Sequence, residues 1–308
     1  MEHLEEPVVS PPAHTVKQSK IGLLYVCIAV FFFSTSPIFV IWAKPFTPVE
    51  IAFWRLAIAT LLVALMGLFT HQKLLLKRRE IPRFAFYGLV TALHFIFYIA
   101  SLSFTTIAHS LALAYTSPVW VTLFSAFVLR EPLPLRKYIG VGVAVIGIAI
   151  MVGFEPNYTT CSLSGSGQCM ILGDVMALLS GLCFAIYSIA GRGERDRHPL
   201  FHYTTNVYGL AALWVMPVAL FFTFQHTSSY PLKAIGAVVA LGIFPLGIGH
   251  TLYNAAVRKV HATYANLIAT QEVTGGIILG ILLVGQVPSV STVIGVVVML
   301  AGIAGVLV

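Results

Sequence analysis

The chain has 308 residues, of which 58% are hydrophobic and 9% are charged, whereas charged residues make up about 25% of an ordinary soluble domain. A soluble fold of this size could not bury that much apolar surface, which excludes an ordinary globular protein. The formal net charge is +7, but Lys and Arg lie in short loops between apolar segments, which argues against nucleic-acid binding. The composition predicts an integral membrane protein.

The first 20 residues precede the apolar part of the chain. They contain Pro7, Pro11 and Pro12, and they lack the basic start and the small-residue cleavage site of a secretory signal peptide. We expect residues 1–20 to form a disordered cytoplasmic tail.

Ten apolar segments follow the tail, and each has the length of about 20 residues that an α-helix needs to cross a bilayer. They are expected near residues 21–43, 48–70, 84–104, 106–129, 134–153, 170–190, 200–222, 233–254, 261–284 and 289–308. The predicted fold class is therefore an all-α membrane protein with ten transmembrane helices.

The longest connection, residues 154–169, separates a first half at residues 21–153 from a second half at residues 170–308. It contains Cys161 and Cys169, which could form a disulfide in an oxidising compartment. Their spacing alone does not decide whether the bond exists.

Basic residues are concentrated in alternate loops, which predicts the orientation of the chain. Of the eighteen Lys and Arg residues, fifteen lie in the tail and in loops on one side, Lys44 and Lys233 lie in loops on the other, and Arg55 lies inside a span. Because basic loops stay in the cytoplasm, both termini are predicted to be cytoplasmic and residues 154–169 external.

The two halves contain related sequences. Residues 139–149 and 294–304 are identical at seven of eleven positions, with an offset of 155 residues. Each half has five predicted spans, and an odd number makes the second half enter the membrane from the opposite side. The sequence thus predicts two inverted five-helix repeats, an arrangement common in transporters that alternate access around a site at the membrane midplane.

Several segments carry a family resemblance. They are Pro48 to Arg55 in the second span, Ala114-Tyr115-Thr116-Ser117-Pro118-Val119-Trp120, Leu129-Arg130-Glu131-Pro132-Leu133, and the glycines Gly140 and Gly147. Together they resemble the EamA-type repeat of the drug/metabolite transporter superfamily. The second half departs from the pattern, because Gln286 replaces the loop Glu and Gln271-Glu272 replaces Ser117-Pro118.

The resemblance implies a transporter in the cytoplasmic (inner) membrane, with export favoured. It also implies that the first four helices of each half surround a central cavity and that the fifth helix of each half lies at the periphery. The departures leave the substrate and the coupling ion open.

Glu272 is the first candidate for a functional residue, because an ionisable group inside a span is rare and usually lines a cavity. Counted along its helix at ~1.5 Å per residue, it lies roughly 16 Å deep, near the midplane. It could couple transport to a proton or cation, or balance the charge of an amine. The alternative is a packing residue beside Gln271.

Arg55 could hold a substrate carboxylate or phosphate. The alternative is that it extends outward to pair with Glu50 near the start of its helix. The other candidates for substrate binding or coupling are polar or aromatic residues in the spans, among them two similar His and Tyr pairs: Gln271, His94, Tyr98, Tyr115, Asn206, His250, Tyr253 and Asn266. The further midplane candidates are Ser36, Trp54, Trp120, Tyr187 and Tyr264.

Enzyme, cofactor and metal signatures are missing from the sequence: there is no phosphate-binding loop and no His-Glu-x-x-His motif. We expect no catalytic residues, cofactor or resident metal. The expected function is secondary transport of a small polar or amphiphilic metabolite such as an amino acid, and the expected partners are that solute, the lipid bilayer and, as a further candidate, a second copy in a homodimer. An intramembrane enzyme acting on lipid and a channel or receptor remain as alternatives.

Overall fold

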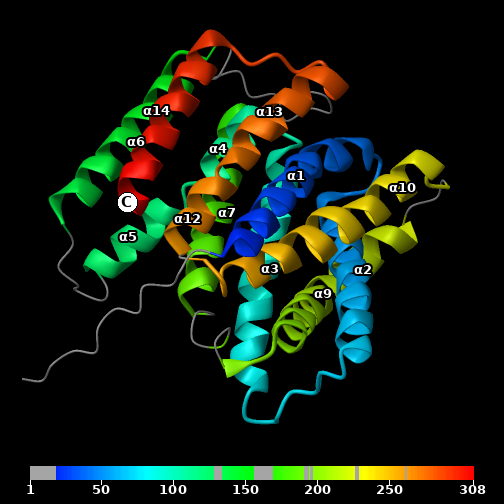
Figure 1. The fold of residues 1–308 in the computed structure, drawn as a ribbon. Coiled ribbons are helices and arrows are strands. Elements are labelled where there is room, and N and C mark those ends of the chain that lie inside the picture. Colours follow the sequence, from blue (N-terminus) through cyan, green and yellow to red (C-terminus); the bar gives the residue numbers. More distant parts are fainter. Residues whose placement is uncertain are drawn as a thin grey trace, which may run out of the picture.

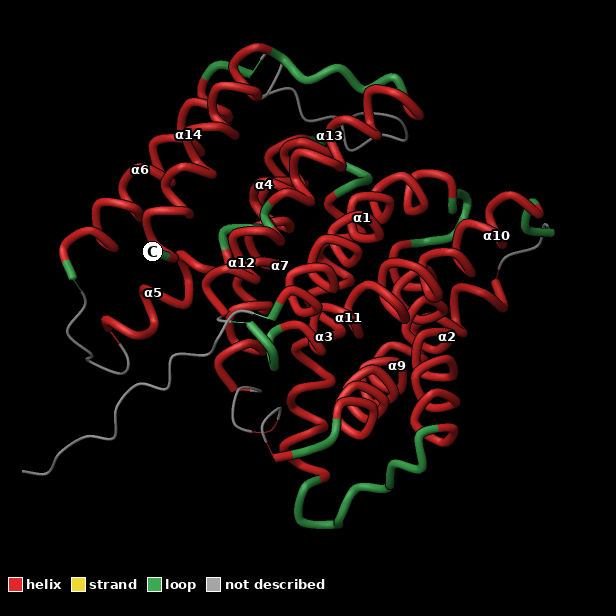
Figure 2. Tube along the Cα trace, viewed as in Figure 1, coloured by secondary structure: helices red, strands yellow, loops and turns green. Residues whose placement is uncertain are grey.

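The structure is a computed structural model that describes residues 19–127, 134–155, 169–190, 194, 197–225, 229–260 and 262–308. These residues contain ten helical segments long and apolar enough to cross a membrane, and they include no strand (Figure 2). The prediction of an all-α membrane protein with ten transmembrane helices is confirmed. Most of the predicted tail and residues 156–168 of the predicted external loop, including Cys161, lie outside the described ranges; Cys169 is disulfide-bonded.

The helices follow the predicted spans closely. The described helices of the first half are α1 (Lys20–Trp42), α2 (Pro48–Phe69), α3 (Ile81–Ser101), α4 (Ile107–Ala114), α5 (Ser117–Phe127) and α6 (Leu135–Gly153). Those of the second half are α7 (Met170–Ala190), α9 (Leu200–Gln225), α10 (Leu232–Leu241), the π-helix η1 (Gly242–His250), α11 (Thr251–Ala256), α12 (Ala262–Ala269), α13 (Gln271–Val284) and α14 (Val290–Leu307).

Three predicted spans are interrupted rather than continuous. The fourth is divided at Tyr115 and Thr116 into α4 and α5, and the ninth is divided at Thr270 into α12 and α13. The eighth changes from α- to π-helix around Pro245 and then returns to α-helix. Pro118 follows the first of these breaks, and a proline ring cannot fit a continuing α-helix without disturbing the turn before it.

The start of α2 is joined to the second half by Glu50. Thr47 and Glu50 form a capping box, in which the Glu50 carboxylate accepts the Thr47 N–H at 2.8 Å. The other carboxylate oxygen accepts the hydroxyls of Thr223, at 2.8 Å, and Tyr230, at 2.6 Å. Burial and this hydrogen bond raise the pKa of Tyr230 to about 12, so its hydroxyl donates at neutral pH. Glu50 is fully engaged without Arg55.

Helices of the first half pack mainly against helices of the second half. In these contacts α1 packs on η1 and α13, α7 packs on α3 and α4, and α2 packs on α9. One apolar core runs through both halves, from Ile38 and Val63 to Val207 and Met299. The two halves are thus interlocked.

The helices α6 and α14 form a separate pair at the edge of the molecule (Figure 1). Their contact follows a stripe of glycines: a Cβ atom on Gly140 would lie 2.8 Å from the carbonyl oxygen of Gly302, and one on Gly147 would lie 2.7 Å from that of Gly295. Only glycine allows such a close approach of two backbones. The pair matches the peripheral place that the family resemblance implies for the fifth helix of each half.

Candidate functional site

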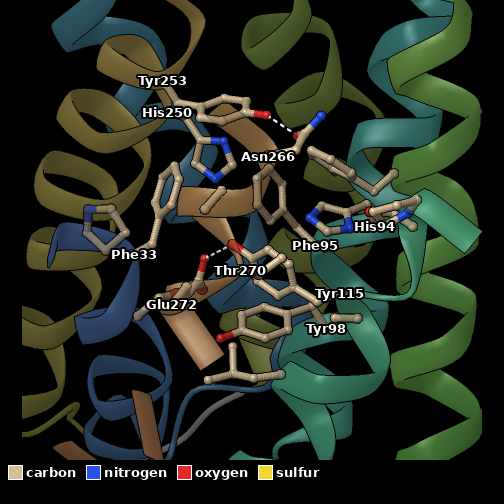
Figure 3. A pocket seen from close by; sticks show the side chains of 18 of the residues that line it. Phe33, His94, Phe95, Tyr98, Tyr115, His250, Tyr253, Asn266, Thr270 and Glu272 are labelled. Carbon is tan, nitrogen blue, oxygen red and sulfur yellow. Dashed lines mark hydrogen bonds between the residues drawn. The ribbon is translucent and has the colours of Figure 1, made fainter. Parts of the chain in front are cut away.

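A cavity lies where the interrupted helices meet (Figure 3). Its walls include Tyr115, Ser117 and Pro118 at the first break, Thr270 and Glu272 at the second, and residues of α1, α2, α3, α7, η1 and α11. The empty space between its walls, with the part open to solvent included, is about 800 Å³. Both halves of the chain contribute to it.

Glu272 is in the first turn of α13, directly after the break. Its carboxylate accepts the hydroxyl of Tyr115, the residue at the break between α4 and α5, at 2.5 Å. This hydrogen bond joins the two breaks and the two halves across the cavity (Figure 3). Glu272 therefore faces the cavity and contacts the opposite half.

Arg55 lines the same cavity from α2, with only 1% of its surface exposed. The guanidinium lies 4.3 Å from the centre of the Phe95 ring. Its Nε and Nη1 atoms are buried without a hydrogen-bond partner among the described residues. Arg55 does not form the pair with Glu50 that the alternative interpretation of the sequence required.

The two predicted His and Tyr pairs also reach the cavity. Nδ1 of His94 lies 3.0 Å from the carbonyl oxygen and 2.9 Å from the hydroxyl of Ser180, and these contacts hold the ring against α7. The His250 ring lies tilted against the Phe33 ring, with ring centres 4.5 Å apart, and the Tyr253 hydroxyl donates to Asn266 at 2.5 Å. The rings are held in place around the open space.

Eight of the ten predicted site residues thus line one cavity: Arg55, His94, Tyr98, Tyr115, His250, Tyr253, Asn266 and Glu272. The other two lie elsewhere. Asn206 donates to the carbonyl oxygens of Leu74 and His202, both at 2.7 Å, so it holds the loop after α2 against α9. Gln271 is exposed although its neighbour Glu272 faces the cavity, because adjacent helical residues point about 100° apart.

Sequence reasoning did not single out the aromatic walls Phe33, Phe95 and Phe184. The chain has 21 phenylalanines, and nothing in the pattern separates these three from core or lipid-facing ones. Thr270 was also missed, because no Pro or Gly marks the break there. Of the further midplane candidates, Ser36 lines the cavity, whereas Trp54, Trp120 and Tyr187 are not part of its wall.

A second polar cluster, away from the cavity, was not predicted. Asp174 in α7 accepts the Thr105 hydroxyl at 2.7 Å and lies 2.8 Å from Nδ1 of His109 in α4. Nε2 of His109 lies 3.2 Å from the hydroxyl of Thr292 in α14, which in turn donates to Glu155 at 2.6 Å. The cluster connects α4, α7 and α14. A single Asp near the end of a predicted helix does not indicate such a cluster.

Within the described ranges, no group of three or more His, Cys, Asp or Glu side chains could hold a metal ion. The cavity has the features of a binding site for a small organic solute: aromatic walls, a few hydrogen-bonding groups, one cation and one carboxylate.

Comparison with known proteins decides the family. The model of the EamA-like transporter family matches this chain twice, at residues 20–153 and 171–308. The chain belongs to the EamA-like transporter family. It is therefore a multi-pass membrane protein and a transporter of the drug/metabolite transporter superfamily.

Relatives agree with this assignment. The EamA-like chain is 29% identical over 245 residues to the pseudopaline exporter CntI of Pseudomonas aeruginosa, which covers 79% of this chain and 81% of that protein. It is 24% identical over 259 residues to YxxF, an uncharacterised transporter of Bacillus subtilis, covering 83% and 79% of the two chains. A solved crystal structure shares the fold, with a TM-score of 0.66 at 19% identity over 92% of this chain and 95% of the other.

Proposed function

We propose that this EamA-like transporter is a secondary exporter of a small polar or amphiphilic metabolite, and that its two halves alternate access to the central cavity. The observation that carries the proposal is the hydrogen bond between Glu272 and Tyr115, which links the two helix breaks across the cavity. Interrupted helices that meet at a site between two halves are a common arrangement in secondary transporters.

The packing of the helices supports two repeats related by a two-fold axis. If α1 corresponds to α7, α3 to the helix containing η1, and α4 with α5 to α12 with α13, the main contacts form reciprocal pairs. The α1–η1 contact matches α3–α7, and α1–α13 matches α4–α7, while α2–α9 and α6–α14 each match themselves. The basic loops support cytoplasmic termini, and the five spans in each half make the two repeats inverted.

Export in exchange for a proton is the coupling that we propose. A carboxylate in a mostly apolar wall can hold either a proton or a cationic group of the solute, so the two compete for Glu272. The titratable and charged groups around it in the cavity are Arg55, His94, Tyr98, Tyr115, His250 and Tyr253. The similarity to an exporter supports outward transport, and the cytoplasmic membrane is the proposed location. The homodimer also remains a proposal.

An intramembrane enzyme and a channel are less well supported. An enzyme acting on lipid would need reactive groups together near one membrane interface, whereas the charged groups of the cavity lie on opposite halves of the chain, Glu272 after a helix break and Arg55 inside α2. A channel normally has a ring of like side chains around its pore, and the cavity has one Arg and one Glu in its wall.

The test is a thermal-shift screen of the detergent-purified protein and its Glu272→Gln variant. The compounds are amino acids, amines, nucleosides and sugar phosphates, each at about pH 5.5 and about pH 8. A solute that binds the folded protein raises its melting temperature. We expect at least one compound to stabilise the wild type, more strongly at the higher pH, and to stabilise the variant less.

The control variant is Gln271→Ala, which changes the exposed neighbour of Glu272. It is expected to respond to the same compounds as the wild type. Equal shifts in the wild type and in Glu272→Gln at both pH values would remove Glu272 from the coupling mechanism.

A further inference from the structure

We propose that the cavity also binds a chloride ion, which Arg55 holds and which binds most tightly when Glu272 is protonated. This inference rests on the proposed function, because it adds a second ion to the exchange of a proton for the solute. Two features of the cavity lead to it: a buried cation that lacks a counter-charge, and a carboxylate that loses its charge when it takes up a proton.

Arg55 is a buried cation whose hydrogen-bond donors are not all used. Its Nε and Nη1 atoms have no hydrogen-bond partner among the described residues, and no carboxylate oxygen in that part of the chain lies within 4.0 Å of its guanidinium nitrogens. A buried charge is unfavourable unless it is paired and hydrogen-bonded. Because Arg55 lines the cavity, we expect an anion that enters the cavity to supply the missing partner.

Two acids belong to the surroundings of Arg55, and neither forms an ion pair with it. The Glu50 carboxylate is occupied by its own helix cap and by two hydroxyls of the second half. Glu272 lines the same cavity but lies more than 4.0 Å from the guanidinium and accepts the Tyr115 hydroxyl instead. The space beside Arg55 is thus open to a separate anion.

The charge of the cavity changes when Glu272 takes up a proton. While Glu272 is ionised, its negative charge and the positive charge of Arg55 balance across the cavity, and Glu272 repels any further anion. When Glu272 is protonated, the repulsion ends and the positive charge of Arg55 has no counter-charge. Chloride affinity should therefore rise as the pH falls. By linkage, bound chloride should favour protonation of Glu272 by the same factor.

The wall beside Arg55 suits a small anion. The Phe95 ring lies 4.3 Å from the guanidinium and covers one of its faces, so an anion approaches along the edge, where the N–H groups point. Tyr98 follows Phe95 by three residues on α3, and Ser36 lines the cavity from α1; the hydroxyls of both are buried. Even when one of these hydroxyls donates to the other, one O–H donor is left for an anion.

The number of charges favours a monovalent anion. Arg55 is the one Lys or Arg residue in the described cavity wall, and a single negative charge neutralises it. A divalent anion such as sulfate or phosphate at neutral pH would leave a surplus charge between mostly apolar walls, which is unfavourable. Chloride is the abundant monovalent anion, and it needs no more than the few N–H and O–H donors that this wall offers.

Other titratable groups face the two charges from the surrounding helices. They are His94 and Tyr98 on α3, Tyr115 at the break between α4 and α5, Tyr208 on α9, His250 on η1 and Tyr253 on α11. Among these residue types, histidine is the one that ordinarily changes charge between pH 5 and pH 8. If a histidine attracted the chloride, the dependence on pH would remain after replacement of Glu272.

The experiment measures the binding of radioactive chloride to the purified full chain in detergent. No solute of the transport screen is present, and sodium gluconate keeps the ionic strength at about 0.15 M. We expect the wild type to bind one chloride per chain, about tenfold more tightly at about pH 5.5 than at about pH 8. Unlabelled chloride should displace the bound label.

Variants assign the site and its dependence on pH. Arg55→Met removes the cation and should abolish binding, whereas Arg55→Lys keeps a positive charge and should bind more weakly than the wild type. Glu272→Gln is uncharged at every pH, so it should bind chloride equally at both pH values and about as tightly as the wild type does at the lower one. Asn206→Ala changes a polar group outside the cavity and should behave as the wild type. If Arg55→Met does not fold, the other variants still test the proposal.

Three results would overturn the chloride proposal: no binding by the wild type at either pH, wild-type binding by Arg55→Met, or a wild-type dependence on pH in Glu272→Gln. The solute screen separates this proposal from the proposed function. A solute that stabilises the protein, together with no chloride binding, overturns the anion site and leaves the transport proposal standing. Chloride binding that follows the expected pattern, together with no response to any solute, supports the anion site and contradicts the proposed function.

Discussion

At the scale of single residues, two of the places where the protein buries charged groups have different consequences. In the cavity, Arg55 and Glu272 retain capacity to bind another group. In the cluster around His109 and Asp174, each described polar atom has a neighbour with which it can hydrogen-bond. We interpret the first place as functional and the second as structural, because a satisfied buried network stabilises one arrangement of the helices that it connects.

Replacement of Asp174 tests the structural role. Asp174→Leu would leave the Thr105 hydroxyl and Nδ1 of His109 buried without this acceptor, and we expect a loss of about 1–3 kcal/mol in the free energy of unfolding. Asp174→Asn keeps one acceptor oxygen and is expected to lose less. Thermal unfolding of the purified variants measures the difference. If Asp174→Leu melts at the wild-type temperature, the cluster is not a stabilising contact.

The site residues that could be predicted from the sequence were those whose chemistry is unusual in a membrane. Glu272, Arg55 and the His and Tyr pairs stood out because polar groups are rare inside apolar spans. Asn206 has the same character but serves the loop after α2, and no pattern in the sequence shows which carbonyl oxygens a side chain will meet. The Phe walls could not be predicted because phenylalanine is equally suited to core, lipid and cavity.

At the scale of helices, the membrane spans can be predicted from the sequence, whereas the breaks within them are difficult to predict. A run of about 20 apolar residues predicts a helix because backbone groups in lipid must be paired within the segment. Pro118 and Pro245 stand at real departures from α-helix, whereas Pro37 and Pro217 lie inside continuous helices. The break at Thr270 has no proline at all.

The contact of α6 with α14 leads to a matched pair of substitutions on one helix. A Cβ atom added at Gly147 would lie 2.7 Å from the carbonyl oxygen of Gly295, whereas one added at Gly142 would have nothing within 4 Å. We expect Gly147→Ala to lose about 1–3 kcal/mol of stability because the helices must separate. Gly142→Ala should be neutral or gain up to about 1 kcal/mol.

Thermal unfolding of the two variants in the same detergent is the measurement. Equal melting temperatures would mean that α6 and α14 do not pack as the glycine stripe indicates. A lower melting temperature for Gly142→Ala than for Gly147→Ala would reverse the assigned contact face.

At the scale of the whole molecule, the loops and the helix contacts predict the orientation. Fifteen of the eighteen Lys and Arg residues belong to the tail and loops assigned to one side, and this side should be cytoplasmic. A reporter that is active only in the cytoplasm should therefore work when fused to either terminus. A reporter that is active only outside should work when inserted in the loop at residues 156–168. Activity of the outside reporter at a terminus would contradict the predicted cytoplasmic termini.

The most direct test of alternating access is the reactivity of a cysteine placed in the cavity. Ser36→Cys changes one atom of a residue in the cavity wall and is made in a chain whose free cysteines, Cys27 and Cys183, are replaced by alanine. In sealed vesicles of either orientation, a membrane-impermeant maleimide is added to one side at a time. Gly142→Cys, on an open face of α6, is the lipid-facing control and should react from neither side. The account predicts that Ser36→Cys reacts with the maleimide whichever side it is added to. Reaction from only one side would contradict it.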